Sequence, residues 1–227
     1  FRLFFTDETY GNQLKKIKKF RKFFFKFALL ILGLISFSGI CFSQTLIVAL
    51  GDSLTEGFGV NKEEAYPFLL EKELSIKGHS VKVVNAGISG STSASAASRL
   101  KWYIRSQPDI IIIALGGNDG LRGLSVLHMK KNLSKAIELA QSEKIQVLLS
   151  GMQIPLNYGK EYTESFRKVF QELAELYKLP MIPFLLKDVG GFPTLNQPDG
   201  IHPNPEGHKI IAATVLKYLE PLLPKIN

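Results

Sequence analysis

The sequence has 227 residues, of which 45% are hydrophobic and 21% are charged. This composition excludes a disordered chain, and the length suits one domain with a short extension rather than a two-domain enzyme. A single cysteine excludes both a disulfide framework and a zinc site built from several thiolates.

The net charge of +8 is concentrated at the N-terminal end. Eight basic and two acidic side chains give residues 1–43 a net charge of +6, which leaves +2 for residues 44–227. A nucleic-acid-binding domain carries its basic residues on the folded domain itself. We therefore expect no nucleic-acid partner, and we expect the basic segment to serve in targeting or surface binding.

Residues 1–43 have the parts of a secretory signal peptide. The basic stretch from Lys15 to Lys26 precedes 16 residues without a charge, 27–42, and the small residues Cys41 and Ser43 lie at the end of this run and directly after it. This pattern predicts cleavage after Ser43 and an exported protein, periplasmic or secreted. The alternative is a membrane anchor that stays on, so that any membrane contact comes only through this segment. As a helix, the apolar run would span about 24 Å, which is less than the roughly 30 Å hydrocarbon core.

Five short apolar runs in residues 44–227 predict β-strands, because turn residues bound each of them. They are Thr45–Leu50, Val81–Asn85, Ile110–Leu115, Gln146–Ser150 and Met181–Leu185. Apolar residues spaced three and four apart predict helices at 66–76, 95–104, 126–140, 166–177 and 210–219, the last preceded by an Asn-Pro cap. This alternation predicts one α/β domain, a three-layer α/β/α sandwich around a five-stranded parallel sheet. Ligands of such sheets bind beyond the carboxyl ends of the strands.

Ser53 follows the first predicted strand in the sequence Gly51-Asp52-Ser53-Leu54. Gly51 allows a sharp turn, which would present the hydroxyl near a helix N-terminus. A serine nucleophile also needs a base and donors for the developing oxyanion. Taken alone, Gly-Asp-Ser at a strand end is more often only a turn with a capping Asp or Ser.

A carboxylate and a histidine lie three residues apart near the C-terminus, at Asp199 and His202. Asp199 is within reach of Nδ1 of His202, which would leave Nε2 free to act as a base. The alternative is a turn closed by the aspartate with a surface histidine. We expect His208, six residues later, at an exposed helix position.

Two further loops follow predicted strands and carry candidate oxyanion donors. Asn118 lies in Gly116-Gly117-Asn118-Asp119, where its amide can point into a cleft, although Asn-Asp-Gly is also a common turn sequence. The loop after the second strand, Asn85–Gly90, offers backbone N–H groups as a further donor, and the alternative is a loop that only closes a βα turn.

Taken together and in this order, the four blocks resemble the SGNH, or GDSL, hydrolase family, from about Thr45 to Leu223. The segments Leu115–Gly123 and Met152–Gly159 are similar to its bacterial arylesterase, thioesterase I and lysophospholipase branch. The resemblance implies a flavodoxin-like sandwich and a serine esterase that uses neither metal nor organic cofactor. It also implies roles for individual residues: Ser53 as nucleophile, His202 as base, Asp199 as its orienting group, and Ser53, Gly90 and Asn118 as oxyanion donors. In the second block, Gly87 is the alternative to Gly90.

The expected function is hydrolysis of carboxylic esters or thioesters of small acyl substrates through an acyl-enzyme, by a monomer. The alternatives are a carbohydrate O-acetyl esterase, a lysophospholipase and a non-catalytic surface-binding protein. The presence of all four catalytic residue types argues against the binding protein. Sugar sites commonly carry aromatic platforms, and we expect the lone Trp102 in the core instead.

The segment after the Asn118 block is expected to shape the acyl site, as the resemblance implies. Leu121 and Leu124 would cover an acyl chain, and Arg122 would meet a phosphate or carboxylate on the leaving group. The alternative is a plain loop with a solvated arginine.

Overall fold

The computed structural model describes residues 15–16, 18–25 and 44–225. The chain divides between Phe42 and Ser43 into two units, and the fold discussed below belongs to the second. Residues 15–16 and 18–25 are helical and exposed. The predicted apolar stretch and cleavage site lie outside the described residues. Among the helices that the structure describes, none combines the length and the apolar character needed to cross a membrane.

Five parallel strands form the predicted sheet, in the order β2-β1-β3-β4-β5. The strands are β1 (Thr45–Gly51), β2 (Val81–Gly87), β3 (Ile110–Ala114), β4 (Gln146–Ser150) and β5 (Met181–Ile182). Every residue of β3 is buried, as its uninterrupted apolar sequence predicts. Strand β5 is shorter than predicted, because the regular pairing with β4 stops at Ile182 and the next N–H to reach the Gly151 carbonyl is that of Leu185, three residues later.

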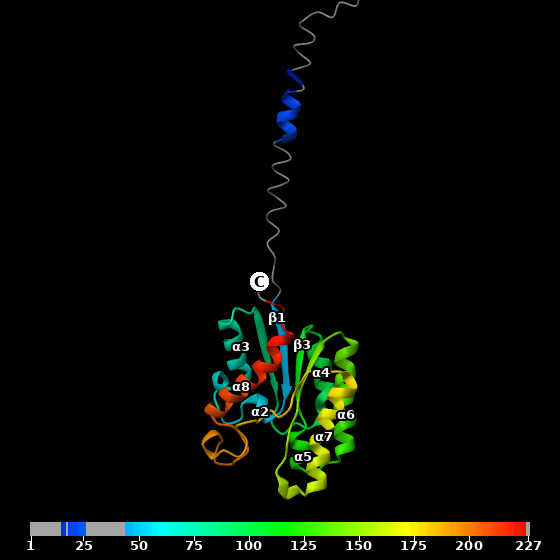
Figure 1. Cartoon of the computed structure of the whole chain (residues 1–227), viewed down its shortest axis with the longest axis vertical. Helices are drawn as coiled ribbons and strands as arrows, with labels where there is room; N and C mark the ends of the chain where they lie inside the picture. Colours follow the sequence, from blue (N-terminus) through cyan, green and yellow to red (C-terminus); the bar gives the residue numbers. More distant parts are fainter. Residues whose placement is uncertain (1–14, 17, 26–43, 226–227) are drawn as a thin grey trace, which may run out of the picture. The chain divides into compact units, whose positions relative to one another are not determined.

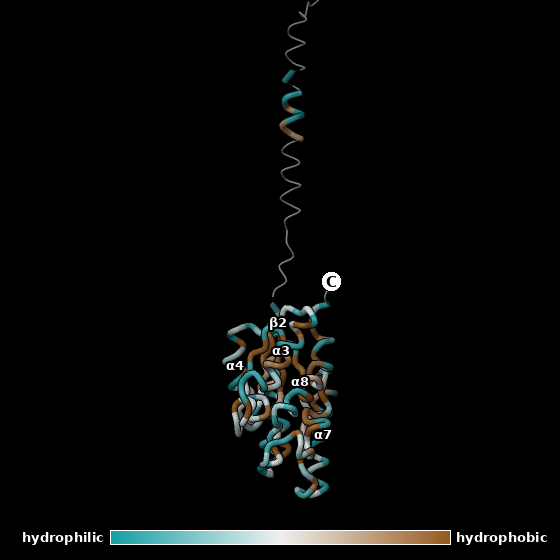
Figure 2. Tube along the Cα trace, turned by 90° about the vertical axis from the view of Figure 1, so that its left-hand side faces the viewer, coloured by the Kyte–Doolittle hydropathy of each residue, from teal (hydrophilic) through white to brown (hydrophobic). Residues whose placement is uncertain are grey.

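Helices cover both faces of the sheet, which confirms the three-layer prediction. The longer helices are α3 (Tyr66–Ile76), α4 (Ala96–Ile104), α6 (Val126–Ser142), α7 (Lys160–Tyr177) and α8 (Pro205–Leu219). Helices α3 and α8 pack together on one face, while α4, α6 and α7 cover the other (Figure 1). The hydrophobic segments lie toward the interior of this domain (Figure 2).

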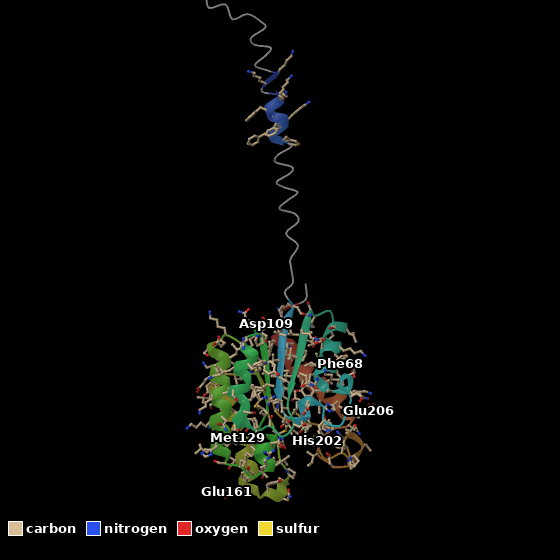
Figure 3. All side chains as sticks on the ribbon, turned by 180° about the vertical axis from the view of Figure 1, so that it is seen from behind. Phe68, Asp109, Met129, Glu161, His202 and Glu206 are labelled. Carbon is tan, nitrogen blue, oxygen red and sulfur yellow. The ribbon has the colours of Figure 1, made fainter. Side chains whose placement is uncertain are left out.

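Two short helices follow strands directly: α2 (Ser53–Glu56) after β1, where a helix N-terminus is expected beside Ser53, and α5 (Gly117–Leu121) after β3, which the sequence pattern does not predict. Because β1 and β3 are neighbours, both helices begin at the point where the strand order reverses, which is the expected ligand-binding edge of such sheets. This carboxyl edge carries His202, whereas Asp109 lies at the opposite, amino edge (Figure 3).

The two ends of the domain meet at the amino edge of the sheet. Thr45, at the start of β1, lines a small surface hollow together with Asp109 and the C-terminal residues Leu222, Leu223 and Pro224. The chain therefore enters and leaves the domain on the side away from the carboxyl edge.

Candidate active site

Ser53 is the first residue of α2, directly beyond the end of β1. Asp52 caps this helix, since its Oδ1 accepts a hydrogen bond from the Leu54 backbone N–H at 3.1 Å. The strand-to-helix turn is tight: a Cβ built on Gly51 would lie 1.9 Å from Oγ1 of Thr55. Close packing at Gly51 thus fixes the half-buried Ser53 at the carboxyl edge.

Asp199, His202 and Ser53 form a continuous hydrogen-bonded series, although Ser53 and His202 are 149 positions apart. Oδ2 of Asp199 lies 2.7 Å from Nδ1 of His202, and Nε2 of His202 lies 3.0 Å from Oγ of Ser53. The backbone N–H groups of His202 and Ile201 also donate to Oδ1 of Asp199. The hydrogen bonds from the His202 backbone, the His202 ring and the Ile201 backbone lower the pKa of Asp199 to about 2.

The candidate oxyanion donors lie on the elements beside this series. Nδ2 of Asn118, in α5, donates to the Ser91 carbonyl at 3.0 Å and to Oδ2 of Asp52 at 3.3 Å. Within the described part of the chain, no protein group accepts a hydrogen bond from the backbone N–H of Ser53 or of Gly90. Both N–H groups therefore remain available to a ligand.

A mainly apolar cavity of about 510 Å³ opens beside Ser53 and His202, a volume that suits a small organic ligand. The side chains that line it include Leu54, Asn118, Leu121, Met152, Ile154, Phe184, Leu186 and Ile201. Of the two leucines predicted to cover an acyl chain, Leu121 lines the cavity and Leu124 does not. Arg122 is also outside the lining, and its guanidinium donates to the Gly90 carbonyl at 2.9 Å.

The sequence model of the GDSL-like Lipase/Acylhydrolase family matches residues 49–210. The chain belongs to this family. The family and the class of activity predicted from the four blocks, hydrolysis of acyl esters, are thereby confirmed.

Two curated relatives and one solved structure are similar over most of the chain. Esterase TesA of Pseudomonas aeruginosa is 40% identical over 182 residues, 80% of this chain and 90% of the relative. Thioesterase 1/protease 1/lysophospholipase L1 of Escherichia coli K12 is 36% identical over 182 residues, 80% of this chain and 86% of the relative. A crystal structure of TesA has a TM-score of 0.76 and 40% identity, with 79% of this chain and all of that chain covered.

Two residues that the sequence analysis did not assign to the site lie next to its reactive groups in this GDSL-family protein. The ring of Phe58 packs on the imidazole of His202, with centroids 4.7 Å apart. Asp52 is 2% exposed, and burial raises its pKa to about 6, against the lowering effect of the Leu54 N–H. The position of Asp52 directly before Ser53 is visible in the sequence, but it indicates a helix cap and not a buried carboxylate beside the reactive groups.

Two predictions of exposure are wrong. His208 is 1% exposed rather than on the surface, because its side of α8 packs against α3, where Nδ1 accepts a hydrogen bond from the Tyr66 N–H at 3.3 Å. Trp102 is 69% exposed on α4 rather than in the core, and Arg105 lies over its ring. Trp102 does not line the cavity.

The buried His208 should make the stability of this GDSL-family protein sensitive to acid. Burial lowers its pKa from 6.5 to about 4, partly offset by the charge of Glu64. Between these pH values the unfolded chain binds a proton that the folded chain excludes, so the free energy of unfolding falls as the pH falls, by about 1.4 kcal/mol per pH unit. Going from pH 7 to pH 5 should therefore cost the wild type about 2 kcal/mol more than the His208→Gln variant.

Urea denaturation of both proteins at the two pH values measures this difference. Any contribution of Asp52, whose pKa shifts in the opposite direction, is common to both proteins and cancels. Equal pH dependence in wild type and variant would show that His208 titrates alike in the folded and unfolded chains.

Proposed function

We propose that the protein hydrolyses carboxylic esters or thioesters of apolar acyl groups through an acyl-enzyme on Ser53. The observation that carries this proposal is the hydrogen-bonded series Asp199–His202–Ser53 at the mouth of the apolar cavity. A hydroxyl within 3.0 Å of an imidazole nitrogen that is itself held by a carboxylate is the arrangement that activates a serine.

In the proposed reaction, Oγ of Ser53 attacks the substrate carbonyl while Nε2 of His202 takes the hydroxyl proton. Asp199 holds Nδ1 of the ring and stabilises the imidazolium, and its low pKa keeps the carboxylate ionised at neutral pH. His202 then gives the proton to the departing alcohol or thiol. Water, activated by the same ring, releases the acid and restores Ser53.

Three donors are proposed for the oxyanion that forms in each step: the backbone N–H groups of Ser53 and Gly90 and the side-chain amide of Asn118. The first two have no protein acceptor among the described residues, so they are free to meet the charge. Nδ2 of Asn118 shares its protons with Ser91 and Asp52, and the longer contact of 3.3 Å to Asp52 is the one that a negative substrate oxygen would compete with.

The apolar lining favours acyl chains longer than acetyl. Each buried methylene contributes up to about 0.8 kcal/mol, so four methylenes gain roughly 3 kcal/mol if the cavity covers all of them. We therefore expect kcat/KM to rise at least tenfold from acetyl to hexanoyl p-nitrophenyl esters. The Leu121→Ala variant should flatten this trend, because Leu121 lines the cavity.

Leu124→Ala is the matched control for the chain-length series, since Leu124 belongs to the same segment but does not line the cavity. Preference for acetyl esters, unaffected by Leu121→Ala, would point instead to the O-acetyl esterase alternative. A parallel series of acyl-thioesters compares the two leaving groups, and inactivity on both series would contradict the proposed function.

We further propose that the protein is exported as a monomer and acts on a small-molecule ester, with residues 1–43 as its signal. Support comes from the basic and apolar stretches and the small residues Cys41 and Ser43. Mass spectrometry of the exported protein tests the proposal, which requires a chain that begins at Gln44.

A further inference from the structure

The loop after β2 turns sharply at Ile88–Ser91, and this turn holds the Gly90 N–H. The Ser91 N–H donates to the Ile88 carbonyl at 3.2 Å, and Gly90 has a φ of 75°. A positive φ at the third turn residue favours glycine and directs the middle peptide, to which the Gly90 N–H belongs, away from the turn's own hydrogen bond.

Little apolar packing fixes this turn in place. Ile88 is 52% exposed, and residues 89–95 are all serine, threonine, glycine or alanine. Such a segment buries too little apolar surface to hold one position within a few tenths of an ångström. Hydrogen bonds from neighbouring elements must therefore supply the constraint.

Side chains of the two short site helices supply these hydrogen bonds. Oε2 of Glu56, in α2, accepts from the Ser89 N–H at 2.6 Å and also from its hydroxyl. Arg122, the C-cap residue of α5, donates to the Gly90 carbonyl at 2.9 Å. The Glu56 carboxylate thus meets an N–H and the Arg122 guanidinium meets a carbonyl, so each charge has the sign that its backbone partner requires.

We infer that Glu56 and Arg122 are positioning residues for the oxyanion site. Glu56 belongs to the helix that begins with Ser53, and Arg122 ends the helix that contains Asn118. The peptide groups on either side of the Gly90 N–H are therefore fixed to the two elements that carry the other proposed donors. This inference rests on the proposed function and assigns Arg122 a role different from the leaving-group contact predicted from the sequence.

The expected effect of removing either contact is on the chemical step. A donor stabilises an oxyanion only when it lies about 2.7–3.1 Å from that oxygen, and one lost donor costs about 10²–10³ in kcat. A displaced donor costs less than a lost one. Because both side chains are exposed, their hydrogen bonds contribute little to the free energy of folding.

The test compares Glu56→Ala and Arg122→Met with the conservative variants Glu56→Gln and Arg122→Lys, which keep an acceptor and a donor. We expect the first pair to lower kcat about tenfold with KM within twofold, and the second pair to retain most of the activity. Affinity for a boronic acid that forms a tetrahedral adduct on Ser53 should fall in step with kcat. The double variant should lose less than the product of the single losses, because both contacts hold one turn.

Glu63→Ala and Arg105→Met are the matched controls, since each removes an exposed charge that does not contact the turn. Asn118→Ala sets the upper limit of the expected loss, because it removes a donor and also the contact of Asn118 with the Ser91 carbonyl. Thermal unfolding reports any loss of fold. Unchanged kcat in Glu56→Ala and Arg122→Met would overturn the inference. A rise in KM with unchanged kcat would also overturn it, as would a fall in kcat that is proportional to the fall in unfolding temperature. Failure of the proposed function is distinguishable, because the wild type would then lack esterase activity altogether.

Discussion

The Ser53→Ala variant is expected to lose ester hydrolysis by a factor on the order of 10⁴ to 10⁶ while it keeps its fold. The methyl group cannot attack the carbonyl, and no acyl-enzyme can form. The hydroxyl itself contributes little to stability, because Ser53 is only half-buried at the end of β1. Without the hydroxyl, the His202 ring still has its hydrogen bond to Asp199. Purified variant and wild type are compared in kcat/KM on hexanoyl p-nitrophenyl ester and in thermal unfolding.

Ser106→Ala is a suitable control for Ser53→Ala, because Ser106 is exposed and its hydroxyl donates to the Tyr103 carbonyl, away from the cavity lining. An organophosphonate should add its mass to the wild type and to Ser106→Ala but not to Ser53→Ala. If the Ser53 variant kept a tenth of the wild-type rate, or if the label mapped to another serine, Ser53 could not be the nucleophile.

The second large effect is expected from the two histidines near the C-terminus. His202→Ala should lower kcat by a factor on the order of 10⁴ to 10⁶, because Ser53 would lose the base that lies 3.0 Å from its Oγ. His208→Gln should keep most of the activity per folded molecule, since His208 bonds to the Tyr66 backbone rather than to Ser53. Rates of both variants, corrected for the folded fraction, separate the roles.

The effects on stability should be the reverse of the effects on activity: the His208 variant should change in stability and the His202 variant should not. His202 is partly exposed at the cavity, so its loss should leave the free energy of unfolding nearly unchanged. His208 is fully packed, so its replacement should shift that free energy and its dependence on pH. An inactive His208 variant beside an active His202 variant would reverse the assignment of the base.

The sheet could be predicted from the sequence because each strand is a short apolar run between turn residues. The start of α7 could not be predicted. Its first turns, Lys160–Ser165, are polar, and apolar spacing begins only at Phe166. Tyr162 and Thr163 nevertheless lie in the helix, where the Tyr162 hydroxyl donates to the Leu124 carbonyl at 2.8 Å. Periodicity detects the face of a helix that packs on the sheet, and it misses turns held by hydrogen bonds to a loop.

Contacts between residues close together in the sequence could be predicted, whereas contacts between distant segments could not. Asp199 and His202 are three residues apart, so their contact follows from local spacing. The burial of His208 depends on α3, which lies more than 130 positions earlier in the chain, and the contact of Arg122 with Gly90 joins two separate loops. Contacts of this kind depend on the strand order, which the sequence pattern does not specify.

Both ends of the domain lie at the amino edge, which has a practical consequence for immobilising the protein. A tether at Thr45 or beyond Leu223 would leave from the side opposite His202, so the cavity would face the solution in either case. An affinity tag, a surface-display fusion or a bead linkage at either end should therefore leave the turnover rate unaltered. Attachment through Lys187, which directly follows the cavity-lining residue Leu186, would instead place the support near the cavity.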